Sequence, residues 1–175
     1  MAIRKKPLVV HLGNVGKDKA KRTRVFAKRF KTLDFIGIDL AKVQRTGHNW
    51  RQVQADFLEG LTKLEDNSAG MITSNMALGY YDKSGKQVIN PKKEHIVNVR
   101  KTIKVCNRKL KPNGKLRILA DEDLFFKVLL PAMTGLFKAD KLKVRLLREE
   151  EYEKTAWLKE AKKEKIKTYE IVAQK

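Results

Sequence analysis

Short apolar runs alternate with longer amphipathic stretches along the chain. The apolar runs have the length of strands, and the amphipathic stretches repeat their apolar residues at helical spacing. The expected strands are the apolar runs 8–12, 35–40, 70–75, 115–120, 142–147 and 167–173, together with the polar stretch 51–54. The expected helices are residues 18–31, 57–64, 92–110, 121–138 and 149–163, with Pro131 either kinking the fourth helix or opening another. This order predicts an α/β protein with a doubly wound, mostly parallel seven-stranded sheet, helices on both faces and an antiparallel edge strand.

Two of the expected helices combine an apolar side with a strongly basic side. In residues 92–110 the apolar side comprises Ile96, Val99, Ile103, Cys106 and Leu110, and the basic side comprises Lys93, Arg100, Lys101, Lys104 and Arg108. In residues 18–31 the corresponding sets are Thr23, Phe26, Ala27 and Phe30, against Lys19, Lys21, Arg22, Arg24, Lys28 and Arg29. We expect each helix to bury its apolar side and to present its cations to solvent. Cys106 is then a core residue and not a nucleophile.

The composition adds a large positive charge to this picture. The 175 residues include 40 Lys and Arg against 20 Asp and Glu, a formal net charge of +20, and residues 1–31 alone hold eleven cations and one acid. Such an excess favours a polyanionic partner, either a nucleic acid or an acidic membrane surface. The length suits a single domain, residues 1–175, in which residues 1–7 form a basic extension.

Several kinds of site and location are excluded or disfavoured. No apolar run is long enough for a membrane span, and residues 1–7 lack the apolar core of a signal peptide, so a cytoplasmic protein is expected. Cys106 is the only cysteine, and His11, His48 and His95 are too scattered to form a recognisable metal motif. We therefore expect neither a disulfide nor a bound metal.

Polar and glycine residues follow the first three expected strands. The first strand leads into a turn with Gly13 and Gly16, the second ends at Asp39, and Asp56 with Phe57 follows the third. In a doubly wound sheet these strand ends are where a ligand binds, and an acid after the second strand can accept hydrogen bonds from a ribose. The alternative is structural, because glycines are common in turns and Asp commonly caps helices.

These segments resemble the successive motifs of class I S-adenosylmethionine-dependent methyltransferases, which have a Rossmann-like fold. The matching segments are residues 13–16, 38–39, 54–57 and 69–76, and the turn Leu110-Lys111-Pro112-Asn113-Gly114-Lys115-Leu116. The family usually has an acid where His11 stands and a G-x-G within the glycine-rich loop. The resemblance implies S-adenosyl-L-methionine as the cofactor. The implied binding residues are Gly13, Asn14 and Gly16 for the methionine part, Asp39 and Leu40 for the ribose, Asp56 and Phe57 for the adenine, and Ser74 and Asn75 beside the methyl-transfer site.

The second half of the chain is most similar to the tRNA guanine-N7 methyltransferases. The similarity covers residues 92–95, the long helix that follows them, and residues 110–114, 118–123, 148–153 and 167–171. That family's P-D-P-W motif after the fourth strand is absent here. The resemblance makes Asp121 a weak candidate for catalysis, beside Asn75 at the end of the fourth strand, and Asp121 can equally be a helix cap. The catalytic group is otherwise unknown.

The resulting expectation is a methyltransferase that modifies a tRNA or rRNA base by in-line methyl transfer. The residues expected to bind RNA are Lys19, Arg22, Lys28, Lys93, Arg100, Lys101, Lys104 and Arg108. Tyr80 and Tyr81 are candidates to stack on the target base, or else simply pack their loop. Two alternatives remain: a catalytically decayed, methyltransferase-like RNA-binding or assembly factor, and a methyltransferase of small molecules.

Overall fold

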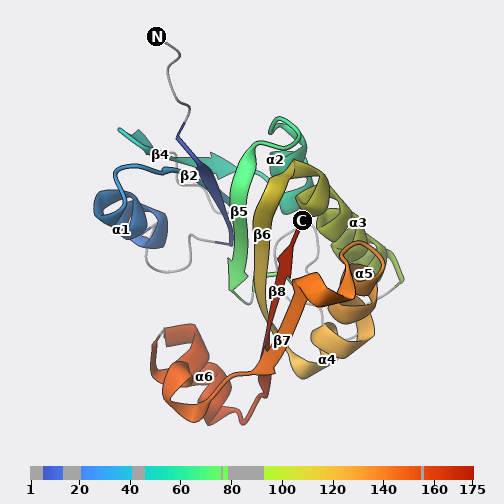
Figure 1. Ribbon diagram of the computed structural model, residues 1–175. Coiled ribbons are helices and arrows are strands. Elements are labelled where there is room, and N and C mark those ends of the chain that lie inside the picture. Colours follow the sequence, from blue (N-terminus) through green and yellow to red (C-terminus); the bar gives the residue numbers. More distant parts are fainter. Residues whose placement is uncertain (1–5, 14–20, 41–45, 76, 79–92, 155) are drawn as a thin grey trace.

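One mixed sheet organises the protein in a computed structural model, which describes residues 6–13, 21–40, 46–75, 77–78, 93–154 and 156–175 (Figure 1). The strand order is β3-β4-β2-β1-β5-β6-β8-β7. The strands are β1 (Leu8–Leu12), β2 (Asp34–Asp39), β3 (Thr46–Gly47), β4 (Trp50–Gln54), β5 (Ala69–Asn75), β6 (Leu110–Asp121), β7 (Leu142–Leu146) and β8 (Thr168–Gln174). All seven expected strands are present, and β3 is a short addition.

The direction of the strands confirms the doubly wound fold. β4, β2, β1, β5 and β6 are parallel, whereas β8 pairs antiparallel with both β6 and β7. The short β3 pairs antiparallel with β4 at the opposite edge. β1 lies between β2 and β5, so the winding of the chain changes direction at β1. The carboxyl ends of β1 and its parallel neighbours therefore lie side by side at one end of the strands. We call this end of the sheet the carboxyl edge.

The helical segments follow the expected order with two subdivisions. The helices are α1 (Lys21–Arg29), α2 (Phe57–Thr62), α3 (Lys93–Lys109), α4 (Glu122–Leu124), α5 (Leu130–Thr134) and α6 (Ala156–Lys163). A π-helical turn, η1 (Phe125–Leu129), joins α4 to α5, and the 3-10 turns η2 (Ala139–Lys141) and η3 (Glu149–Lys154) flank β7. Pro131 opens α5 in its first turn, where a missing N–H costs little. None of these helices is long and apolar enough to cross a membrane.

The two faces of the sheet are covered differently. Neighbouring residues of a strand point to opposite faces, so Val10 packs on one side and Val9 on the other. The face that contains Val10 is covered by α2, α3, η1 and α5, and we call it the first face. On the second face α1 packs over Val9 and Phe35, while η3 and α6 pack over Leu119 near the carboxyl edge. Figure 1 accordingly shows α1 and α3 on opposite sides of the sheet.

The amphipathic pattern of α3 is confirmed. Val99, Ile103 and Cys106 are buried against the first face, and the five expected cations are exposed. Burial also raises the pKa of the Cys106 thiol to about 12, which leaves no reactive thiolate near neutral pH.

The expectation for α1 needs a correction, because its apolar side is only partly buried. Ala27 is buried, but Phe26 and Phe30 remain 39% and 38% exposed. The two rings stack on each other with centroids 6.0 Å apart, and Phe26 also meets the edge of the His11 ring. Ala27 takes the place directly against Val9 and Phe35, so the two rings lie along one flank of the helix.

The expected turn at Pro112-Asn113-Gly114 occurs as a bulge inside β6. Ala69 pairs with Leu110 and Met71 with Lys115, so the intervening residues bulge out of the ladder. Asn113 has a left-handed φ of 64°, and a Cβ on Gly114 would lie 2.8 Å from the carbonyl oxygen of Lys111. Glycine is therefore required at this close approach of two backbones.

Candidate functional site at the carboxyl edge

The carboxyl edge brings together the residues that follow five parallel strands. Gly13 follows β1, Asp39 ends β2, Asp56 follows β4, Asn75 ends β5 and Asp121 ends β6. These positions are spread over more than a hundred residues of sequence, and parallel pairing alone gathers them.

Gly13 lies at the centre of this edge in a conformation that other residues rarely adopt. Its φ is +69°, and its N–H donates to the carbonyl of Ile38 at 2.9 Å. A Cβ at this position would lie 1.8 Å from the Cβ of Ala77 and 3.5 Å from Cζ of Phe57. The backbone of β1, the start of α2 and the segment after β5 thus meet here. Asn14 and Gly16 lie outside the described residues.

Asp39 and Leu40 leave β2 beside Gly13. Asp39 is partly buried, and its carbonyl accepts a hydrogen bond from the N–H of Ala55 at 3.0 Å. This bond ties the end of β2 to the end of β4 and fixes the point at which the Asp39 side chain leaves the sheet. Leu40 is 45% exposed, an unusual exposure for leucine that leaves an apolar surface next to the acid.

Asp56 is the N-cap of α2. Its Oδ1 accepts a hydrogen bond from the N–H of Glu59 at 2.8 Å, and its backbone is extended, as an N-cap requires. The capping alternative for this acid is therefore realised. The residue as a whole is exposed to solvent. Phe57 is the first residue of α2 and is partly buried.

Ser74 and Asn75 have different surroundings. Ser74 is fully buried, and its Oγ accepts a hydrogen bond from the N–H of Leu78 at 3.1 Å. The hydroxyl therefore holds the turn that follows β5 and sets the position of Ala77 against Gly13. Asn75 is partly exposed at the end of the strand, on the face opposite Ser74.

Asp121 also acts as a helix cap. Its Oδ1 accepts from the N–H of Leu124 at 2.9 Å, which starts α4. The neighbouring Glu122 lies 3.8 Å from the ammonium of Lys167. The structure thus assigns Asp121 a capping contact, and it stands two strands away from Gly13.

The expected RNA-binding cations fall on two opposite faces of the molecule. Lys93, Arg100, Lys101 and Lys104 are exposed on α3, and Lys28 is exposed on α1. α3 starts at the carboxyl edge and runs back toward the opposite edge, so Lys93 is near the site and Arg108 is remote from it. Arg108 is also paired with Asp66 at 3.3 Å. Lys19, Tyr80 and Tyr81 lie outside the described residues, as does the side chain of Arg22.

Sequence reasoning missed two buried charges. Lys109 is 4% exposed, and its ammonium donates to Asp66 at 2.6 Å and to the carbonyl of Leu64. Its position three residues after Cys106 on the buried stripe of α3 was the available signal. Glu170 of β8 is also buried, between Arg117 and Arg145, each of which donates to it at 2.5–2.6 Å. No pattern within β8 alone indicates its two partners.

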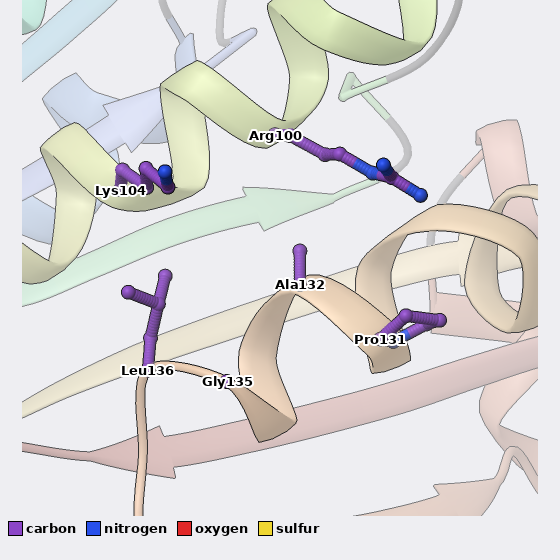
Figure 2. Close-up of a pocket in the computed structure, with 6 residues that line it drawn as sticks. All are labelled: Arg100, Lys104, Pro131, Ala132, Gly135 and Leu136. Atoms are coloured by element: carbon purple, nitrogen blue, oxygen red, sulfur yellow. The ribbon is translucent and has the colours of Figure 1, made fainter.

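Two surface hollows lie away from the carboxyl edge. One, of about 350 Å³, separates α3 from α5, with Arg100 and Lys104 facing Ala132 and Leu136 (Figure 2). The other, of about 570 Å³, lies between α1 and the start of β4. Among the described residues no group of three His, Cys, Asp or Glu side chains is arranged to hold a metal ion.

No protein-family profile and no curated protein matches the sequence. Solved structures do match the fold. A SAM-dependent methyltransferase from Archaeoglobus fulgidus superposes with a TM-score of 0.61 at 15% identity, over 98% of this chain and 87% of that one. The 16S rRNA methyltransferase KamB superposes with a TM-score of 0.62 at 11% identity, over 96% of this chain and 87% of that one. Phosphoethanolamine N-methyltransferase 2 of Haemonchus contortus, in complex with S-adenosylhomocysteine, gives 0.61 at 15% identity, over 99% of this chain and 50% of that one. The chain therefore has the α/β fold of class I S-adenosylmethionine-dependent methyltransferases.

Proposed function

We propose that the protein is a cytoplasmic S-adenosylmethionine-dependent methyltransferase that acts on a base in RNA. The observation that carries the proposal is the meeting of Gly13, Asp39 and Phe57 at the carboxyl edge, beside the strand where the winding changes direction. A ligand in this fold class binds at that point. The proposal treats residues 1–175 as one domain with a basic extension at residues 1–7.

The residues at this edge fit the proposed cofactor. The Asp39 carboxylate would accept hydrogen bonds from the ribose hydroxyls, and Leu40 with Phe57 would offer apolar surface to the adenine. Asp56 keeps Oδ2 for an adenine contact while Oδ1 caps α2. The left-handed Gly13, with Asn14 and Gly16 after it, would bring bare backbone up to the methionine part. Ser74 would act indirectly, by holding the turn that borders the site.

The proposed methyl transfer requires mainly that the protein position the nucleophile relative to the cofactor. When bound, S-adenosylmethionine supplies an electrophilic methyl carbon on a sulfonium, and a nucleophile placed in line with that bond can displace the sulfur. The protein must exclude water, hold the nucleophile in line and take up a proton where the nucleophile carries one. Asn75 is the better placed of the two candidates, because it ends β5 next to β1, whereas Asp121 already caps α4.

The case for RNA rests on charge. Lys93, Arg100, Lys101 and Lys104 form no ion pair with any acid among the described residues, so their charge is available to a polyanion. Lys93 brings this series to the carboxyl edge. KamB is a 16S rRNA methyltransferase, which gives a precedent for RNA on this fold. Tyr80 and Tyr81 are proposed to stack on the target base, and guanine N7 is kept as a candidate target atom from the sequence resemblance alone.

One specific observation favours a second candidate, an RNA-binding or assembly factor without catalysis. Ala77 packs directly against Gly13, and His11 stands where the resembling family usually has an acid. Both features reduce the polar surface that the methionine part of the cofactor would meet. A methyltransferase of small molecules, a reaction class represented by the Haemonchus contortus enzyme, is the third outcome that the experiment must separate.

Calorimetry with S-adenosylmethionine tests the proposal directly. We expect binding by the wild type and a loss of roughly ten- to a hundredfold in Asp39→Ala, because two charge-assisted hydrogen bonds disappear. Asp140→Ala, on the exposed turn η2, is the matched control and should bind normally. Methyl-label transfer to total RNA, followed by nucleoside identification, then gives the target. Binding without transfer to RNA would support a small-molecule substrate, and absence of binding would leave only the non-catalytic factor.

A further inference from the structure

We propose that the hollow between α1 and the start of β4 is a second RNA-binding site, which takes a nucleotide of a single-stranded segment. Its lysines would contact the phosphates and Trp50 would contact the base. This inference rests on the proposed function in one respect, namely that the partner is RNA. It adds a place for that RNA remote from the carboxyl edge.

The hollow has walls that the fold holds in place. It measures about 570 Å³ and is lined by Lys6, Ala27, Lys28, Lys31, His48, Asn49 and Trp50. The Asn49 side-chain amide donates to the carbonyls of Ala27 and Leu33 at 3.0 and 2.9 Å, so it fixes the end of α1 to the strand segment. The Lys6 ammonium donates to the carbonyl of Lys31 at 3.0 Å and closes the other side. A volume of this size is adequate for a nucleotide.

The chemistry of the lining points to a polyanion. Among the described residues, three lysines line the hollow and no acid does. Neither Lys28 nor Lys31 forms an ion pair with any acid in the described part of the chain. Three ammonium groups around one concave surface repel one another, and bound phosphate groups would relieve this repulsion.

Trp50 favours a nucleic acid strand over other polyanionic ligands. The indole lines the hollow and is partly exposed. A Cβ on Gly47 would lie 2.0 Å from its Nε1, so the glycine permits the ring to lie against β3. An aromatic side chain among cations is the combination that binds unpaired bases together with their phosphates. An acidic peptide has carboxylates but no flat base to stack, so it would leave the indole without a matching surface.

The hollow between α3 and α5 provides an internal comparison. It also has two cations, Arg100 and Lys104, but the wall that they face consists of Pro131, Ala132 and Leu136 (Figure 2). In the part of the chain that the structure describes, no aromatic ring lines it. That hollow can attract phosphates but offers no stacking surface, so the site at Trp50 is the one suited to an unpaired nucleotide.

The position of the site sets a minimum size for the substrate. Trp50 is the first residue of β4, and the candidate cofactor residues lie beyond its last residue. A strand of this length spans about 15 Å. An RNA that reaches both the carboxyl edge and Trp50 must therefore extend along β4 over several nucleotides, whereas a nucleoside or a dinucleotide can engage only one of the two places.

Tryptophan fluorescence gives the direct readout of this site. Trp50 and Trp157 are the two tryptophans, so a Trp157→Phe background leaves Trp50 as the sole reporter. We expect quenching of its emission by an unstructured RNA oligonucleotide of about ten residues and none by a poly-glutamate peptide of equal charge. Equal responses to the two polymers, or no response to RNA, would overturn the proposal.

A charge-reversal pair measures what the lysines contribute. We expect Lys28→Glu/Lys31→Glu to weaken RNA binding at least tenfold and to lower the salt slope by about two. The control, Lys138→Glu/Lys143→Glu, makes the same charge change at exposed residues elsewhere and should weaken binding much less. Equal losses in the two double variants would overturn the site. The variant should still bind S-adenosylmethionine, so failure of this site is distinguishable from failure of the proposed methyltransferase function.

Discussion

The first and second faces of the sheet use the same strands in different ways. On the first face a single buried cluster extends from Ile36 through Val10 and Ile118 to Ile171, under a continuous layer of helices. On the second face the buried residues form two small clusters, one under α1 and one under α6. Beside the cluster under α6, on β6, β8 and β7, lies a polar network in which Glu170 is held by Arg117 and Arg145.

The two faces therefore contribute unequally to stability. A continuous apolar layer removes the most surface from water, so the first face should supply most of the folding free energy. The second face leaves Phe26 and Phe30 half exposed and carries the hollow at Trp50. The chain thus concentrates its core on one side of the sheet and leaves apolar rings and a hollow accessible on the other.

The largest expected effect comes from truncating matched leucines on the two faces. Leu129 is fully buried in the first cluster, and Leu158 is 5% exposed in the small cluster under α6. We expect Leu129→Ala to lower the free energy of unfolding by about 4 kcal/mol and Leu158→Ala by about 2 kcal/mol, because a small peripheral cluster can collapse around the missing atoms. Urea denaturation followed by circular dichroism measures both. A loss in Leu158→Ala equal to that in Leu129→Ala would contradict the contrast between the faces.

An intermediate effect is expected at the polar network of the second face. Glu170→Gln leaves Arg117 and Arg145 without their shared carboxylate. We expect this change to lower the free energy of unfolding by about 2 kcal/mol. Glu153→Gln is the matched control. Glu153 contacts Lys159 and Lys162 on the surface, and these contacts lower the pKa of its carboxyl. Solvent screens that pair, so the control should unfold at the same urea concentration as the wild type. If Glu170→Gln unfolds at the same urea midpoint as the wild type, the network contributes no net stability.

The smallest effect on stability at neutral pH concerns Cys106 in the first-face core. Because burial raises its pKa from 9.0 to about 12, the unfolded chain releases the thiol proton at a lower pH than the folded protein does. Stability from this group is therefore constant below pH 9 and falls as the pH rises from 9 toward 12. We expect a thiol reagent at pH 8 to modify Cys106 only after urea unfolds the protein. Rapid modification of the native protein would place Cys106 outside the core.

The sequence predicted most of the strands well because they are short apolar runs between turn residues, whereas residues 51–54 are a polar stretch. Residues 142–147 and 167–173 differ from the observed β7 and β8 by one residue at each altered end. The turn predicted at Pro112-Asn113-Gly114 coincides with the bulge in β6. No turn residue in the sequence indicated the π-helical turn η1, whose residues Phe125, Val128 and Leu129 are buried.

The site was predictable in its location but not in its contacts. The acids and glycine after the strands meet at one edge, as parallel pairing requires. The capping bonds of Asp56 and Asp121 and the burial of the Ser74 hydroxyl depend on backbone geometry that the spacing leaves open. The sequence likewise did not predict that Lys28 and Arg100 lie on opposite faces of the sheet, because a count of charges along the chain does not show on which face of the sheet each helix lies.

The late position of β8 in the chain constrains the order of folding during synthesis. β7 pairs only with β8 in the described structure, although β7 leaves the ribosome more than twenty residues earlier. The five parallel strands can assemble before Thr168–Gln174 appears, whereas β7 and Arg145 must wait for it. A nascent chain paused before residue 168 would therefore display β7 with both of its backbone edges unpaired, and such a species is a target for chaperones or for aggregation.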